Sequence, residues 1–143
     1  MDRNLGLTLI ARLGMRTIVQ IAKPAIVMTS LAFRASLEVT DHSRAKKASD
    51  RIPGWLGEQG VNDELDAIER DILETPYRQL EDRQRRDANW SGEGAWIMAW
   101  ALKLVELPPN RETVDPRILV ERLGILRQDV TELTATVSLK TAP

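Results

Sequence analysis

The sequence has no cysteine and only one histidine, His42. Without cysteine the chain cannot form disulfides, thiolate nucleophiles, zinc fingers or cysteine-ligated iron–sulfur clusters. One histidine is too few for a multi-histidine metal site within one chain. We therefore expect no metal site, no cofactor and no catalytic residue, and the composition favours binding over catalysis.

Aromatic residues make up only 4% of the chain, and no long stretch alternates between apolar and polar residues with a period of two. Both features argue against β-strands, whereas apolar residues at helical spacing recur along the chain. A length of 143 residues is that of one ordinary domain. We predict an all-α fold, a single-domain bundle of about six to seven helices over residues 1–143, with a central tryptophan-rich helix.

The spacing predicts helices over residues 5–14, 24–39, 44–59, 62–74, 90–105 and 116–126. Residues 77–87 are very polar and are expected as a loop or a solvated helix. Residues 1–24 are expected as a loosely attached basic helix. Residues 129–143 are expected as a frayed tail, although 129–139 also suits a short helix or a strand.

Residues that begin or end helices place these boundaries. Gly14 is expected to end the first helix, and Pro24 suits the first turn of the second. Asn62 and Asn89 are candidate N-caps, because a short side chain there accepts a hydrogen bond from a free backbone N–H group. The pair Asp115-Pro116 is a cap followed by proline at the first helical position, which is a strong start signal.

Charge is distributed unevenly along the chain. Residues 1–60 carry nine Lys/Arg against five Asp/Glu, whereas residues 61–143 carry eleven against sixteen, so the halves have charges of +4 and −5. The basic half suits an acidic partner, nucleic acid or anionic lipid, or it simply complements the acidic half. The apolar run over 18–33 is interrupted by Gln20, Lys23 and Pro24, and falls short of the ~20 apolar residues of a membrane span. We therefore predict a cytoplasmic protein.

Glu93 breaks the pattern of the helix predicted over 90–105. At about 100° per residue, Trp90, Trp96, Ile97 and Trp100 share a face, and Glu93 lies in the middle of it. A carboxylate left charged and alone in a core is strongly destabilising. We therefore expect Glu93 to be paired, protonated or directed into a cavity.

The helix predicted over 24–39 offers partners for this carboxylate. Arg34 and Glu38 are four residues apart and can pair with each other, or Arg34 can reach Glu93 across the helix contact. One interpretation is a buried Arg–Glu network that orients two helices. The other is an acidic pocket under Trp90 and Trp96 that binds a ligand or performs acid–base chemistry. The candidate binding residues are Arg34, Glu38, Trp90, Glu93 and Trp96.

Several segments resemble a known family. The motif W-x-x-E-(A/G)-x-W-x-x-x-W-A-L of the bacterial family called domain of unknown function 4272 is matched here by Trp90, Glu93, Trp96, Trp100, Ala101 and Leu102. The resemblance extends over roughly residues 25–115, through the segments Trp55–Gly60, Glu69–Leu73, Ala32–Ala35 and Leu107–Pro109. It implies that Glu93 and the tryptophans belong to a shared framework, and it brings no cofactor or catalytic residue with it.

These observations favour a protein whose partner is another protein. We expect a non-catalytic interaction module, either an adaptor or an inhibitor of the kind that bacterial immunity proteins represent. One alternative is a small-molecule-binding or hydrolytic protein that uses Arg34, Glu38 and Glu93. Another is nucleic-acid or membrane-surface binding through the basic N-terminal segment.

Overall fold

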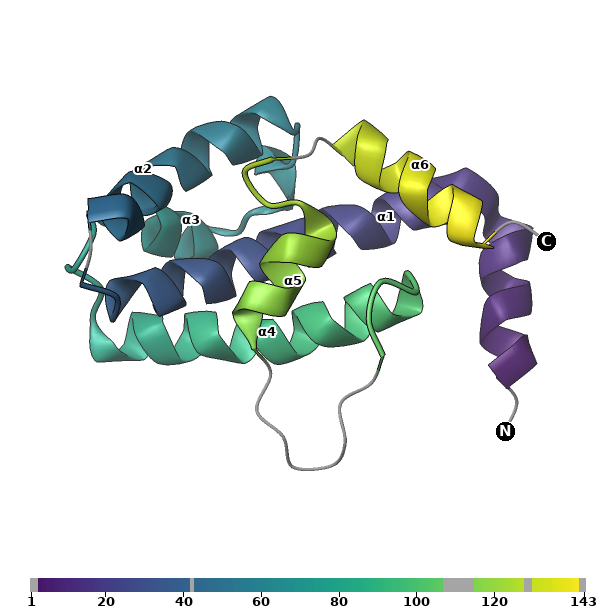
Figure 1. Ribbon diagram of the computed structural model, residues 1–143, viewed down its shortest axis with the longest axis horizontal. Helices are drawn as coiled ribbons and strands as arrows, with labels where there is room; N and C mark the ends of the chain where they lie inside the picture. The colour runs from purple at the N-terminus through teal and green to yellow at the C-terminus, as the bar shows by residue number, and fades with distance from the viewer. Residues whose placement is uncertain (1–2, 42, 107–114, 128–129, 142–143) are drawn as a thin grey trace.

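The computed structural model describes residues 3–41, 43–106, 115–127 and 130–141, and the side chains of 18–41, 43–106, 115–127 and 131–137. This described part of the chain is all-α, as the sequence predicts, with six α-helices, one short 3₁₀-helix and no strand (Figure 1). The elements are α1 (Arg3–Glu38), α2 (Ser43–Glu58), the 3₁₀-helix η1 (Asn62–Glu64), α3 (Ala67–Glu74), α4 (Asp82–Ala101), α5 (Pro116–Leu123) and α6 (Val130–Thr141).

Helix α1 runs through the middle of the bundle and contacts α2 to α6 and η1 (Figure 1). It is continuous over 36 residues, so the predicted separation into two helices at Gly14 and Pro24 is wrong. A proline inside a helix removes one hydrogen bond and costs about 3 kcal/mol. Apolar residues on both sides of Pro24 offset this cost, because Ile18, Ala22 and Ala25 are all buried. Residues 18–24 are therefore part of the core, and no boundary separates them from the rest of the domain.

The segment Ile18–Glu38 of α1 is long and apolar enough to cross a membrane, with a mean hydropathy of 1.3. In the folded chain 61% of this segment is buried, and its partners are the other helices of the bundle. Core helices pass the same test of length and composition as membrane spans. The buried Arg34, within this segment, is also an expensive residue for a lipid environment.

The helix ends show which cap residues are used. The cap of α3 is Asp66, not Asn62: its carboxylate accepts from the backbone N–H of Glu69, whose side chain accepts in return from the N–H of Asp66. Helix α4 begins at Asp82, so the polar stretch over 77–87 is partly helical and Asn89 lies inside the helix rather than at its cap. Residues before Trp90 thus extend this helix by two turns.

The C-terminal part of the chain packs against α1. Asp115 caps α5 as predicted, accepting from the backbone N–H of Arg117 at 2.9 Å. The hydrogen bonds from the Arg117 side chain and from its N–H hold the pKa of Asp115 below its usual value of 3.8. Residues 130–141 form helix α6, which contacts α1 and buries Leu133 and Val137. This segment is therefore a docked helix rather than a frayed tail.

Candidate functional site

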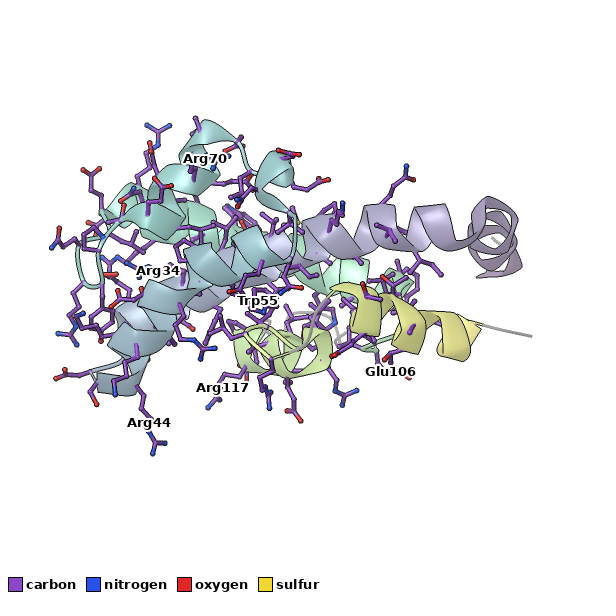
Figure 2. The ribbon with its side chains drawn as sticks, turned by 90° about the horizontal axis from the view of Figure 1, so that it is seen from above. Arg34, Arg44, Trp55, Arg70, Glu106 and Arg117 are labelled. Atoms are coloured by element: carbon purple, nitrogen blue, oxygen red, sulfur yellow. The ribbon has the colours of Figure 1, made fainter. Side chains whose placement is uncertain are left out.

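Arg34 is the centre of a buried network between α1 and the segment that joins α3 to α4. Its side chain is fully buried, and Nη1 donates to Oε2 of Glu38 at 2.8 Å. Nη2 donates to the carbonyl oxygens of Thr75 at 3.0 Å and Pro76 at 3.1 Å. Figure 2 shows Arg34 among the packed helices, whereas Arg117 extends from the surface. The predicted pairing of Arg34 with Glu38 is confirmed.

Glu38 holds the other side of the same connecting segment. Its carboxylate accepts from the backbone N–H groups of Arg78 at 3.1 Å and Leu80 at 3.3 Å. The Thr75-Pro76 step ends α3 and leaves carbonyl groups without helical partners, and these are the acceptors that Arg34 uses. The ion pair therefore satisfies both the acceptors and the donors of one turn, and this agrees with a network that orients helices.

The predicted pocket that joins this pair to Glu93 and the tryptophans is not formed. Glu93 is exposed, and Trp90 is 65% exposed, so the expectation that they face the core is wrong. Trp96 is buried, and its Nε1 donates to the carbonyl oxygen of Glu106 at 2.7 Å. Arg34 and Glu38 are instead buried in the core, where both hydrogen-bond to the segment that connects α3 to α4.

Small residues explain why α4 turns Trp90 and Trp100 outward. Its buried face is formed largely by Ala88, Gly92, Ala95 and Ala99, at intervals of four, three and four residues. A stripe without bulky side chains lets two helices approach closely. At the flank, a Cβ atom added to Gly94 would lie 3.0 Å from Cε of Met28 on α1, which leaves little room. The sequence contains this stripe, and it is the signal that reasoning from hydrophobicity alone misses.

The opposite side of α4 carries a row of exposed large side chains. We call it the outer α4 face and define it by Trp90, Glu93, Ile97 and Trp100, which are three, four and three residues apart and so lie on one side of a helix. Trp90, Ile97 and Trp100 are 65%, 59% and 47% exposed. From the size of such side chains, the three expose on the order of 350 Å². A patch of that size on a monomer is often a binding surface.

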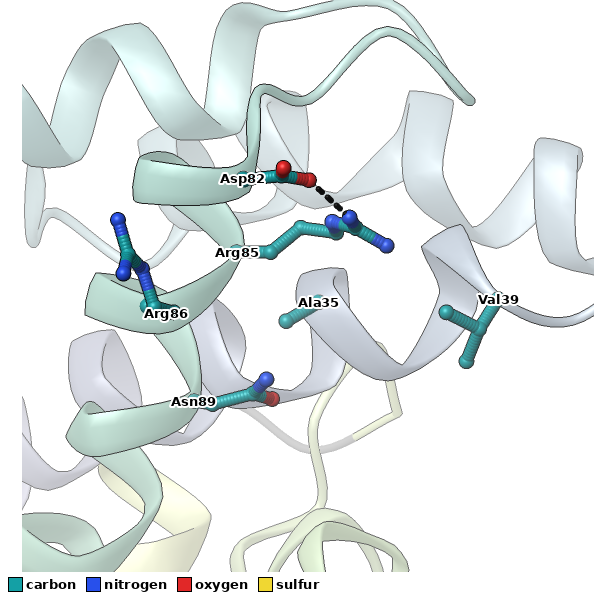
Figure 3. A pocket seen from close by; sticks show the side chains of 6 residues that line it. All are labelled: Ala35, Val39, Asp82, Arg85, Arg86 and Asn89. Carbon is teal, nitrogen blue, oxygen red and sulfur yellow. Dashed lines mark hydrogen bonds and ion pairs between the residues drawn. The ribbon is translucent and has the colours of Figure 1, made fainter.

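A shallow pocket of about 480 Å³ lies beside this face, between the C-terminal end of α1 and the first turns of α4 (Figure 3). Ala35 of α1 and Val39, the residue that follows α1, line one side of it. Asp82, Arg85, Arg86 and Asn89 line it from α4. Arg85 hydrogen-bonds to Asp82, so part of the positive charge is already neutralised. None of the binding residues predicted from the sequence lines this pocket.

No group of three or more histidine, aspartate or glutamate side chains comes together to hold a metal ion within the described ranges. The carboxylates of the outer surface are spread over several helices, and Glu38 is already saturated by Arg34 and two backbone N–H groups.

The comparison with protein families agrees with the motif of the tryptophan helix. The family described as domain of unknown function (DUF4272) matches residues 11–143, and the chain belongs to this family. No curated protein and no solved structure matches the chain. The motif residues now have distinct places: Trp96 and Leu102 are buried, whereas Trp90, Glu93 and Trp100 face solvent. The motif segment at 107–109 lies outside the described residues.

Proposed function

We propose that this protein is a non-catalytic interaction module that binds another protein through the outer α4 face. The observation that supports the proposal is the exposure of Trp90, Ile97 and Trp100 on one side of one helix. Tryptophan is enriched at the energetic centres of protein interfaces, because it buries a large apolar surface at low cost in conformational entropy. Burying all three would remove roughly 350 Å² of apolar surface from water.

Glu93 specifies the chemistry of the partner. It lies in the middle of the apolar row, so any surface that covers the tryptophans also covers this carboxylate. A covered carboxylate needs a hydrogen-bond donor, because leaving it unpaired would oppose binding. The proposed partner therefore presents an apolar patch with an arginine, a lysine or a free N–H group near its centre. An adaptor or an inhibitor of the immunity type both act by such contacts alone.

The decisive variant is Ile97→Glu, which adds a charge to the centre of the face. Its matched control is Ile68→Glu on α3, since Ile97 and Ile68 are 59% and 61% exposed and neither change disturbs the core. Tagged protein is used for affinity capture from the native host. We expect wild type and Ile68→Glu to retain the same partner and Ile97→Glu to lose it. Equal recovery by Ile97→Glu, or repeated capture without any partner, would refute the proposal.

The other functional hypotheses have less support. A small-molecule site at Arg34 and Glu38 would have to displace hydrogen bonds that both side chains already make within the fold. Binding of nucleic acid or membrane surfaces through the basic N-terminal segment predicts retention on DNA or anionic vesicles that falls steeply with salt. Retention of that kind, unchanged by Ile97→Glu, would favour the N-terminal segment over the outer α4 face.

A further inference from the structure

We infer that the outer α4 face also binds itself: two copies of the chain pair through α4, antiparallel and related by a two-fold axis. The inference rests on the proposed use of this face for protein binding and adds one specific occupant, a second copy. It follows from three properties of the described residues: the spacing of the face, the charges at its ends and the groups around Glu93.

The spacing of the face reads the same in both directions along the helix. The successive intervals between Trp90, Glu93, Ile97 and Trp100 are three, four and three residues. A two-fold axis midway between Glu93 and Ile97 therefore places Trp90 opposite Trp100 of the second copy, and Glu93 opposite Ile97 of the second copy. Self-complementarity of this kind is the requirement for a closed two-fold dimer.

The charges next to the face favour the antiparallel orientation. Asp87 lies on α4 before the row, and Lys103 lies in the turn that follows the end of α4. Both are exposed, and neither has a hydrogen bond or ion pair through its side chain to the described residues. The same axis brings the beginning of α4 in one copy, which carries Asp87, towards the end of α4 in the other copy, which Lys103 follows. A parallel pair would instead place Glu93 against Glu93, which like-charge repulsion disfavours. Rim ion pairs add little affinity but help to set orientation.

The outer α4 face also contains hydrogen-bond donors for the carboxylate of Glu93. Among the described residues, the indole N–H of Trp96 is bonded within the chain, whereas those of Trp90 and Trp100 have no acceptor. In the antiparallel register Glu93 of one copy lies next to Ile97 and Trp100 of the other, where an indole N–H is available to the carboxylate. The carboxylate gains a donor and the indole gains an acceptor, so both polar groups are satisfied when the face is covered.

The size of the face indicates a weak dimer. The three apolar side chains of two copies together bury on the order of 700 Å² of side-chain surface, whereas stable specific complexes bury about 1,200–2,000 Å² in total. We expect monomers at low micromolar concentration and dimers at several hundred micromolar. Because such a dimer is weak, a different protein that binds the face more tightly would displace the second copy by mass action.

Sedimentation equilibrium of the full chain tests the pairing, at concentrations from about 5 to about 500 µM, a range suited to a small interface. We expect the mean mass of wild type and Ile68→Glu to rise towards that of a dimer, and Ile97→Glu to remain monomeric. Glu93→Leu exchanges a carboxylate for an apolar side chain opposite Ile97 and is expected to tighten association by about tenfold. A monomeric wild type throughout this range, or equal association by Ile97→Glu, would overturn the inference.

The register has its own test, because the chain has no cysteine of its own. Glu93→Cys and Ile97→Cys variants, carrying different tags, are mixed and oxidised. We expect a crosslink between the two variants to form faster than a crosslink of either variant with itself. Faster self-crosslinking of Glu93→Cys would indicate a parallel pair and refute the antiparallel register.

The outcomes separate the dimer from the proposed function. If the wild type stays monomeric but captures a host protein that Ile97→Glu loses, the dimer is refuted and the proposed interaction module is supported. If the wild type dimerises through the face but captures no other protein from the host, the dimer is supported and the proposed interaction with a different protein is refuted.

Discussion

Replacing Glu38 with glutamine tests whether the buried ion pair is part of the framework. The substitution preserves the shape of the side chain but only one acceptor oxygen. The N–H groups of Arg78 and Leu80 donate to different oxygens of Glu38, so glutamine keeps an acceptor for only one of them. The substitution also removes the one carboxylate that balances Arg34, whose side chain is fully buried. The remaining acceptors of the guanidinium are the carbonyl oxygens of Thr75 and Pro76.

The magnitude follows from the burial of both partners, which are 0% and 6% exposed at the side chain. Removing one member of a buried ion pair costs about 3–5 kcal/mol, because the other charge is left without a counterion in a medium of low polarity. Arg34→Met is expected to cost a similar amount, since Glu38 then remains charged. The double variant Arg34→Met/Glu38→Gln removes both charges. Its cost should fall short of the sum of the two single costs by about 2 kcal/mol or more.

Urea denaturation followed by circular dichroism at 222 nm measures these free energies of unfolding. The pair Lys46 and Asp50 on α2 is a matched control. It has the same four-residue spacing and a distance of 3.0 Å, but its side chains are 65% and 53% exposed. Asp50→Asn is expected to cost at most about 0.5 kcal/mol. A cost of Glu38→Gln no larger than that of Asp50→Asn, or additive costs in the double variant, would refute the structural role of the pair.

Two further predictions concern single hydrogen bonds. Trp96→Phe keeps most of the ring in the core but removes the donor to the carbonyl of Glu106, and is expected to cost about 1–3 kcal/mol in the same urea assay. Asp115→Ala removes the cap of α5 and is expected to cost about 1 kcal/mol at neutral pH. Because Arg117 lowers the pKa of Asp115, the ionised cap stabilises the fold fully at pH values above 3.8, the ordinary pKa of an aspartate. This stabilisation is lost as the pH falls through the lowered pKa.

Controls separate these effects from loss of packing. Trp90→Phe changes an exposed indole and should leave the free energy of unfolding nearly unchanged, so an equal loss in Trp90→Phe and Trp96→Phe would contradict the role of the buried hydrogen bond. For Asp115, the uncharged cap Asp115→Asn provides the comparison. The stability difference between wild type and Asp115→Asn should be constant at neutral pH and shrink in acid. A difference that grows below pH 3.8 would reverse the predicted sign.

The parts of the fold that the sequence predicts are those governed by local interactions. Helical spacing without strand signals predicts the all-α fold, and the Thr75-Pro76 and Asp115-Pro116 steps locate two helix boundaries. The pairing of Arg34 with Glu38 is equally local, since four residues separate them on one helix. These features depend on neighbours along the chain and need no knowledge of how the helices pack.

The errors concern choices that only packing can decide. Pro24 is a helix start by local rules, yet burial on both sides of it keeps α1 continuous. On α4 two faces compete for the core, one with Trp90 and Trp100 and one with alanine and glycine. Hydrophobicity favours the first, but close packing against α1 selects the second, so Glu93 faces solvent. Arg34 also donates to the carbonyl oxygens of Thr75 and Pro76, about 40 residues further along the chain. Helical spacing cannot predict a contact between residues so far apart in the sequence.

The central position of α1 has a consequence for the chain as it is synthesised. Among the described helices α1 is made before the others, which pack against it, and its main partner is α4. From Glu38 to Ala101 the ribosome must add roughly 60 residues, which at about 5–20 residues per second takes about 3–12 s. During this interval α4 is not there to cover the apolar side of Ile18–Glu38, and the composition of this segment satisfies the test for a membrane span. We therefore expect nascent-chain chaperones to bind this segment until α4 has been made.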